Sequence, residues 1–306
     1  MFVRVGILGF VALAVGAGCR DKGASPTKDP ETTPVAPPSA SVSLAPGAAS
    51  ATPAPAALPP VPALASRKVA SRVLADGSLL GEFSFERAAG DEGMAWLAAE
   101  DACVAAGKHL CTATQWQAAC DADPAVGAVE TWTLTPERDA GFFVRGGGTG
   151  CGRKTVSPGA QASPFRAGAC CSPALAAAGR DIQPAMLRAM AKNVLDLERA
   201  LNTRRASALA GFFDERVQVF LKEKSRAEAV SVFEYEFGKY EDYAAVHELC
   251  DFSAAEDDRT YTADCRKITR FGGKIGHVLT RYVFVAGSGK LRSITDPAVY
   301  RAFAEP

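Results

Sequence analysis

One stretch decides the fold of the first half of the chain, and it reads Gly107-Lys108-His109-Leu110-Cys111-Thr112-Ala113-Thr114-Gln115-Trp116-Gln117. Small and apolar residues in 96–105 predict a helix before it, and Gly107 suits the end of that helix because glycine readily adopts left-handed backbone angles. Leu110 lies in a predicted short strand. Thr112 is a predicted helix cap, since its hydroxyl can accept an unpaired backbone N–H.

The same stretch resembles the G-K-R-L-[PC]-T-E-A-E-W-E signature of the sulfatase-modifying-factor family, which has the formylglycine-generating-enzyme fold. Three more segments match in the family's order. Residues 127–132 stand where the family has G-N-V-W-E-W, residues 144–148 where it has R-G-G-S, and Cys170-Cys171 where many bacterial members end. The resemblance implies a truncated C-type-lectin-like domain over residues 66–177.

Departures from the family pattern remove its chemistry. The family enzyme holds copper between two nearby cysteines, whereas Cys151 stands alone in that region and one thiolate cannot make such a site. Ala128 replaces an asparagine associated with calcium, and Thr131 and Gln115 replace glutamates, which lowers metal affinity. We therefore expect a retained scaffold that binds no metal and no cofactor.

Several residues near these segments have two interpretations. Trp96, Trp116 and Trp132 can pack in the core or stack on a ligand, and we expect them in the core. His109 replaces a family arginine and is interpreted as a half-exposed structural residue rather than a catalytic base. Gly146–Gly148 is expected to form a tight turn rather than an anion-binding nest.

Residues 180–306 carry a different pattern. Hydrophobic residues at three- and four-residue steps from Met186 to Leu201 predict a long helix. A shorter helix is predicted near Ser207–Phe213, and a third helix opens with a capping box formed by Ser225 and Glu228. Strands are predicted at Asp214–Leu221, Val246–Phe252, Tyr261–Phe271, Ile275–Ala286 and Leu291–Thr295.

This order of elements resembles the SnoaL-like or nuclear-transport-factor-2-like family, and the segment Leu201–Asp214 resembles the opening of that family's sequence. The resemblance implies an α+β cone, in which helices and a curved antiparallel sheet enclose a pocket. Some members use the pocket for catalysis and others for binding or dimerisation, so the fold alone does not choose. The chain as a whole is therefore predicted to be α+β, with two small domains.

The cone has residues that could form a catalytic acid–base pair. A pocket-facing His277 beside an aspartate would form one, and Asp251, Asp264 and Asp296 are its candidate partners. The other interpretation places His277 on the outer, solvent-facing side of the sheet, and we favour it. His247 is interpreted in the same way.

The chain has nine cysteines. Without Cys19, an even number remains in each half: Cys103, Cys111, Cys120, Cys151, Cys170 and Cys171 in the first, and Cys250 and Cys265 in the second. Even counts indicate disulfides within each half and an oxidising compartment. Metal binding and free thiols are the alternatives, although the spacings match no zinc site. The six cysteines of the first half allow several connectivities, and none is assigned.

Hairpin geometry pairs the last two cysteines. A turn at 256–259, rich in acidic residues that favour turns, places Cys250 directly opposite Cys265 on one face of the sheet. Closure of the loop by Ala255 and Thr260 would put the cysteines at a non-hydrogen-bonded pair, the closer kind. A Cys250–Cys265 disulfide is predicted.

The N-terminus has the features of an export signal. Arg4 precedes an apolar run, and small residues 16–18 precede Cys19. Residues 1–19 therefore resemble a bacterial lipoprotein signal peptide with Cys19 as the lipidated residue, although Gly16 stands where the lipobox usually has leucine. Ordinary signal cleavage and an uncleaved anchor are the alternatives. Residues 20–65, rich in Pro and Ala, are interpreted as a disordered linker, either a spacer or a mere tail.

Lys+Arg and Asp+Glu both number 34, so the chain has no net charge and is not expected to bind nucleic acid. We expect an exported lipoprotein, held by its lipid on the periplasmic side or the outer surface of the outer membrane. It would act as a binding or envelope-assembly module for a small ligand or an envelope protein. The alternatives are a lyase, isomerase or hydrolase with its pocket in the cone, and a redox or metal role in the first half.

Overall fold

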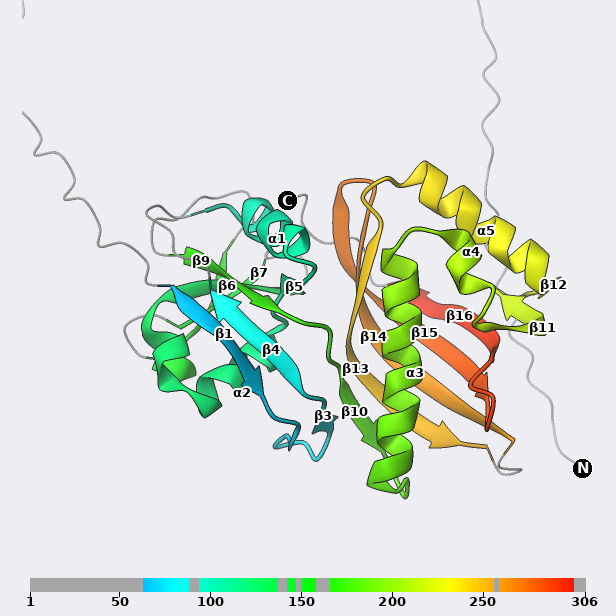
Figure 1. The fold of residues 1–306 in the computed structure, drawn as a ribbon, viewed down its shortest axis with the longest axis horizontal. Helices are drawn as coiled ribbons and strands as arrows, with labels where there is room; N and C mark the ends of the chain where they lie inside the picture. Colours follow the sequence, from blue (N-terminus) through cyan, green and yellow to red (C-terminus); the bar gives the residue numbers. More distant parts are fainter. Residues whose placement is uncertain are drawn as a thin grey trace, which may run out of the picture. The chain divides into compact units, whose positions relative to one another are not determined.

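The computed structural model describes residues 63–87, 94–136, 142–146, 150–157, 166–255 and 259–299. These residues form two mixed β-sheets with helices packed on them, so the fold is α+β (Figure 1). They belong to one compact unit. The predicted signal peptide with Cys19, nearly all of the predicted linker, Gly147-Gly148 and the turn at 256–258 lie outside the described residues.

The first sheet belongs to the N-terminal half. Its strand order is β1 (Leu64–Val69), β4 (Phe83–Arg87), β9 (Arg166–Cys171), β6 (Glu130–Pro136), β7 (Phe142–Arg145) and β8 (Lys154–Ser157), with β5 (His109–Leu110) also paired to β9. Two α-helices accompany it, α1 (Trp96–Ala105) and α2 (Ala113–Ala122), with short 3₁₀ turns η1 (Pro124–Ala128) and η3 (Gly150–Gly152). Trp96, Trp116 and Trp132 are fully buried, so their predicted place in the core is confirmed.

The decisive stretch folds for local reasons. Gly107 has a φ of 70°, the left-handed angle that a helix end requires. Thr112 caps α2: its hydroxyl accepts from the backbone N–H of Gln115, and the Gln115 side chain accepts from the backbone N–H of Thr112 at 3.0 Å. Gln115 also donates to the Ser172 carbonyl. His109 is buried, because β5 is covered on both sides, so the half-exposed position expected for it is wrong.

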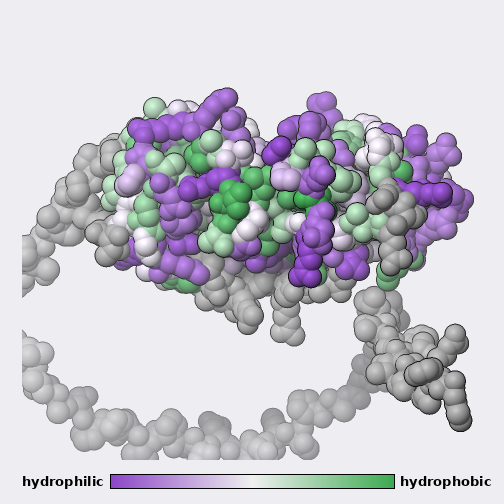
Figure 2. All heavy atoms as spheres, turned by 90° about the horizontal axis from the view of Figure 1, so that it is seen from below, coloured by the Kyte–Doolittle hydropathy of each residue, from purple (hydrophilic) through white to green (hydrophobic). Residues whose placement is uncertain are grey.

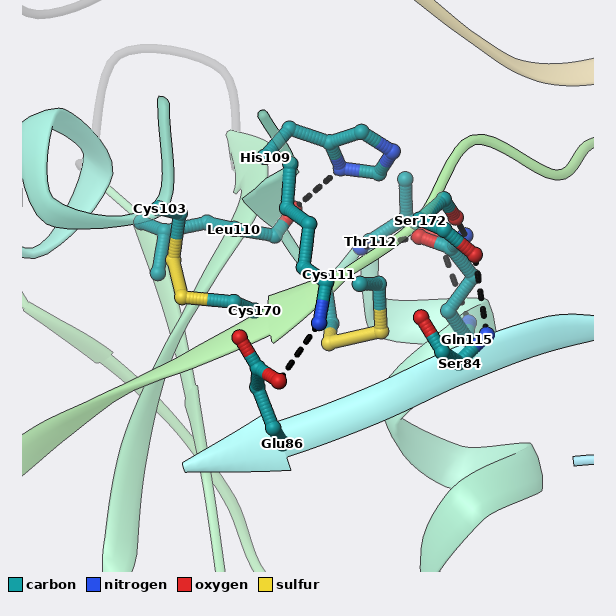
Figure 3. The surroundings of a disulfide bond; sticks show 12 residues. Ser84, Glu86, Cys103, His109, Leu110, Cys111, Thr112, Gln115, Cys170 and Ser172 are labelled. Atoms are coloured by element: carbon teal, nitrogen blue, oxygen red, sulfur yellow. Dashed lines mark hydrogen bonds and ion pairs between the residues drawn. A yellow bond between two sulfur atoms is a disulfide. The ribbon is translucent and has the colours of Figure 1, made fainter. Parts of the chain in front are cut away.

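Adjacent cysteines in β9 hold the first half together from two sides (Figure 3). Cys170 is bonded to Cys103 of α1, and Cys171 is bonded to Cys111. Successive residues of a strand point to opposite faces, so the two bonds lie in different hydrophobic clusters. A third bond joins Cys120 to Cys151. Disulfides of this number are typical of an oxidising compartment.

The second sheet has nine strands. Their order is β12 (Lys222–Ser225), β11 (Phe213–Val219), β16 (Leu291–Val299), β15 (Lys274–Val285), β14 (Thr260–Phe271), β13 (Ala244–Ala254), β10 (Ala176–Gly179), β3 (Leu79–Leu80) and β2 (Arg72–Val73). Three helices belong to this half, α3 (Pro184–Asn202), α4 (Ala206–Leu209) and α5 (Arg226–Lys239). The capping box of Ser225 and Glu228 at the start of α5 is present, as predicted.

Strands from both halves contribute to this sheet. β10 pairs with β13 in parallel, and β3 and β2 extend the sheet beyond β10 although they come from the N-terminal half. On the outer face, the Thr135 hydroxyl donates to the buried Glu248 carboxylate at 2.8 Å. The two halves are therefore joined by backbone pairing and by a buried polar contact.

The hairpin of β13 and β14 contains one irregularity. The register shifts between His247 and Leu249, so Glu248 is an extra residue in β13. Beyond this bulge Cys250 faces Cys265, and the two form a disulfide with Cα atoms 4.0 Å apart. His247 and Glu248 are both buried, because both faces of the sheet are covered at this point.

Candidate functional site

A pocket of about 230 Å³ opens on the inner face of the second sheet. Its wall is mainly apolar and is formed by Leu201, Phe233, Phe271, Val278 and Ile294. A few polar side chains converge on it, from β14, β16 and the α5–β13 region. Apolar walls with a small number of placed polar groups are typical of small-molecule sites.

Lys267 is the most unusual of these polar residues. It lies on β14, lines the pocket and is only 5% exposed. Among the described residues, no carboxylate lies within ion-pair distance of its ammonium. Burial lowers the pKa of Lys267, and the more distant Asp296 carboxylate partly opposes this effect. An ammonium in this position is therefore poorly exposed to solvent and has no ion-pair partner among the described residues.

Asp296 and Tyr243 face the same pocket. The Asp296 carboxylate accepts a hydrogen bond from the Thr280 hydroxyl at 2.7 Å, which fixes its orientation. Burial, together with the carboxylates of Asp296 and Glu236, raises the pKa of Tyr243, so its hydroxyl keeps its proton. Thr269 also lines the pocket, and its buried hydroxyl has no hydrogen-bond partner among the described residues. The site thus presents the Lys267 amine, the carboxylates of Asp296 and Glu236, and the hydroxyls of Tyr243, Thr269 and Tyr240.

A polar network of Glu198, His247 and Tyr282 lies buried in the same half, and the second Glu198 oxygen has no hydrogen-bond partner among the described residues. One Glu198 oxygen accepts from the backbone N–H of His247 at 2.6 Å and lies 2.9 Å from its Nδ1, and His247 Nε2 lies 2.9 Å from the Tyr282 hydroxyl. Burial lowers the pKa of His247 more than Glu198 raises it. Both ring nitrogens are engaged, and none of the three residues lines the pocket, so the network is structural support rather than the site itself.

The solvent-facing position expected for His247 is therefore wrong. β13 turns this side chain toward the interior, where α3 supplies Glu198 as its partner. The expectation failed because alternation along a strand divides residues between two faces without saying which face is covered.

The structure does not bring the predicted His277–aspartate pairs together. His277 lies on the outer face, where its Nε2 is 3.6 Å from the Glu248 carboxylate. Asp264 is paired with Arg281 through two hydrogen bonds of 2.7 and 2.9 Å. Asp251 stands opposite Asp264 and is exposed. Only Asp296 of the named aspartates reaches the pocket.

Lys267 and Tyr243 are pocket residues that sequence reasoning missed. For Lys267 the sequence does contain a weak indication. Lys267 shares a strand face with Cys265, two residues away, and a disulfide cysteine is a strong marker of the buried face. A lysine at a position that alternation assigns to the core is rare enough to be noted.

The pocket mouth includes the tip of the hairpin between β11 and β12. Phe220 lines the pocket, and Phe220 and Leu221 both have positive φ angles, 48° and 70°. Two-residue hairpin turns with such angles normally use Asn-Gly, because bulky side chains are strained there. Both side chains are exposed, at 43% and 79%. Figure 2 shows another view of the surface, with hydrophobic residues set among hydrophilic ones.

Among the described residues of the first half, no group of three or more His, Cys, Asp or Glu side chains could hold a metal ion. Cys151 is bonded to Cys120 and so has no thiolate to offer while the disulfide is intact. Among the described residues no helix is long and apolar enough to span a membrane.

No family model matches the chain, and no curated protein matches it. Several solved structures are similar over part of it. A domain with a cystatin-like fold from Nostoc punctiforme is 15% identical, with 39% of this chain and 80% of that one covered and a TM-score of 0.33. Aln2 from a Streptomyces species is 13% identical, with 38% and 92% covered and a TM-score of 0.33. A protein described as a polyketide cyclase from Pseudomonas putida is 13% identical, with 36% and 90% covered and a TM-score of 0.29. Each likeness covers little more than a third of this chain, so the chemistry of the site rests on its own residues.

Proposed function

We propose that this chain is an exported binding protein whose C-terminal half, a nuclear-transport-factor-2-like cone, holds a small and mainly apolar ligand. The observation that carries the proposal is Lys267, an amine that is 5% exposed and lines an apolar pocket without an ion-pair partner among the described residues. A buried polar group without a partner costs free energy, and a ligand that supplies the partner recovers it.

The lining restricts the ligand's polar end. Lys267 donates hydrogen bonds, whereas the Asp296 carboxylate accepts them. A neutral group that both accepts and donates, such as a hydroxyl, fits between them better than a second carboxylate would. The volume of about 230 Å³ lies below the 300 Å³ at which drug-sized sites begin, so the ligand is compact. A bicyclic aromatic alcohol combines a compact apolar body with a hydroxyl of this kind.

Replacement of Lys267 with methionine tests the pocket. Methionine has a similar length but cannot donate, and a hydrogen bond to a charged group is worth about 1.5–3 kcal/mol, so affinity for 2-naphthylmethanol is expected to fall roughly tenfold or more. Calorimetric titration of the full-length protein measures this. Lys222→Met, which removes an exposed lysine from β12, is the matched control. Equal affinity of the Lys267 variant and the wild type would refute this pocket as the site.

The strained hairpin tip gives a second test. Phe220→Asn with Leu221→Gly should stabilise the protein by about 1 kcal/mol, because Asn-Gly adopts the observed backbone angles with little strain. The same change removes a wall of the pocket mouth and should weaken binding of 2-naphthylmethanol a few-fold. Urea unfolding and titration report the two effects. Leu221→Gly alone keeps Phe220 and should leave affinity unchanged; weaker binding there would contradict the assignment of the wall.

A second candidate function is catalysis of the lyase or isomerase type. Asp296 and Lys267 line the same pocket, so the carboxylate could remove a proton next to a carbonyl while the ammonium stabilises the oxygen anion that forms. Exchange of the methyl protons of 2-acetylnaphthalene with deuterated water would reveal this activity, and Asp296→Asn would abolish it. If the methyl protons exchange no faster than in buffer alone, this catalytic function is contradicted and binding remains the proposed function.

The N-terminal half is proposed to be a non-catalytic, sulfatase-modifying-factor-like scaffold. Gln115, which stands where that family has a glutamate, is used for capping and for the bond to Ser172. The only cysteine near the family's copper site is held in the Cys120–Cys151 disulfide. The half would present or position the ligand-binding cone in the cell envelope.

Attachment to a membrane is proposed to occur through a lipid on Cys19. Cys19→Ala should release the mature protein into the soluble fraction or leave it unprocessed, because the acyl chains supply the membrane affinity. Fractionation of cells, together with mass spectrometry of the N-terminal peptide, measures both results. Cys250→Ala, which removes a cysteine from a disulfide far along the chain, controls for effects of cysteine loss. A processed Cys19 variant that stays with the membrane would contradict lipid anchoring.

A further inference from the structure

The surroundings of Lys267 are those of a reactive amine. Across β14 its neighbours in register are His247 on β13 and Val278 on β15. His247 is already engaged with Glu198 and Tyr282, and Val278 is apolar. The other residues that line the pocket are the apolar side chains, then Asp296, Tyr243 and Thr269 described above, and Glu236 and Tyr240 at the end of α5. Among the described residues, none forms a hydrogen bond with the Lys267 amine.

We propose that Lys267 also forms a Schiff base with ligands of the same shape that carry an aldehyde or ketone group in place of the hydroxyl, an inference that rests on the proposed ligand pocket. The neutral amine nitrogen donates its electron pair to the carbonyl carbon, and a C–N bond forms. The carbonyl π pair moves to the oxygen, which takes up a proton, while the nitrogen releases one. A second proton, taken from solvent, converts the carbinolamine hydroxyl into a leaving water, and the nitrogen electron pair then forms the C=N bond of a protonated imine. The step needs no oxidant or reductant, and water reverses it.

The pocket supplies what this step requires. Burial lowers the pKa of Lys267, so a larger fraction of its amine is neutral than for an exposed lysine. Asp296 can accept the proton that the nitrogen loses, and the protonated Tyr243 hydroxyl can donate toward the departing oxygen. A charged imine would also lie near the Asp296 carboxylate, which stabilises it more than a neutral ligand.

Reductive trapping tests the inference on the full-length protein. The protein is incubated with 2-naphthaldehyde and sodium cyanoborohydride near neutral pH, and peptides are mapped by mass spectrometry. Only an imine is reduced to a stable naphthylmethyl amine. Because burial lowers the pKa of Lys267 and the pocket holds the aldehyde beside its amine, Lys267 is expected to be labelled faster than the exposed Lys222. Excess 2-naphthylmethanol should protect Lys267 and leave Lys222 unaffected.

The outcomes separate this inference from the proposed function. Selective, protectable labelling of Lys267 supports both. Binding of 2-naphthylmethanol without selective labelling overturns the Schiff base and leaves the pocket in place. Failure of both experiments overturns the pocket as well. Lys267→Arg, which keeps a charge but cannot form a stable imine, should lose the label; a label of unchanged yield on that variant would show that the adduct lies elsewhere.

Discussion

Replacement of Glu198 with alanine is expected to destabilise the protein by about 3–5 kcal/mol. Glu198 is 1% exposed, and one of its oxygens accepts from the backbone N–H of His247 and lies within hydrogen-bond distance of its ring. Each buried donor left without an acceptor costs about 1–3 kcal/mol. The lost side chain also leaves a cavity beside α3 that the sheet cannot fill without moving.

Urea unfolding measures this loss and is best done at about pH 7.5. At that pH His247 is neutral in both states, because burial lowers its folded pKa and the unfolded value is about 6.5. Glu198→Gln keeps an acceptor oxygen and should cost much less. Glu234→Ala, on the exposed side of α5, should change stability by no more than about 0.5 kcal/mol. A loss of less than about 1 kcal/mol in Glu198→Ala would show that water or a shifted side chain replaces the carboxylate.

Local structure could be predicted from this sequence because neighbouring residues determine it. Thr112 and Ser225 cap helices through contacts with residues three positions away. Gly107 ends α1 because few other residues adopt its φ angle. The hairpin that joins Cys250 to Cys265 likewise depends on a short turn and on strand alternation. None of these features requires knowledge of the rest of the fold.

The pocket could not be predicted, because it depends on which side of each strand is covered. Alternation placed His277 and its strand neighbours on one face, but the helices cover the other face. The Glu248 bulge shifts the register of β13 by one residue, and no residue type marks it. β10 adds the N-terminal half to the second sheet through parallel pairing between residues distant in sequence. These features are set by tertiary contacts, and they determine that Lys267 rather than His277 faces the pocket.

Removal of both disulfides that end on β9 is expected to cost more than the sum of their separate losses. Cys103–Cys170 and Cys111–Cys171 span 67 and 60 residues, and the two loops overlap almost completely. While one is intact, the other closes an additional loop of only about nine residues, worth roughly 2.5 kcal/mol in the entropic model. The last one removed also frees the large loop and costs about 4 kcal/mol. The double removal should therefore cost about 6–7 kcal/mol, against about 5 for the two single losses added.

Cysteine-to-alanine pairs in a double-mutant cycle test this coupling by urea unfolding of the full-length protein. Cys250→Ala with Cys265→Ala is the matched control, because that disulfide closes a separate 15-residue span in the second sheet and should add independently to either loss. A loss of 6–7 kcal/mol approaches the whole stability of many domains, so the N-terminal half of the quadruple variant should become sensitive to protease while the strands β13–β15 stay protected. If the two losses simply add, the unfolded chain must keep β9 close to α1 without any covalent link. The two disulfides would then stabilise the native state directly instead of constraining the unfolded state.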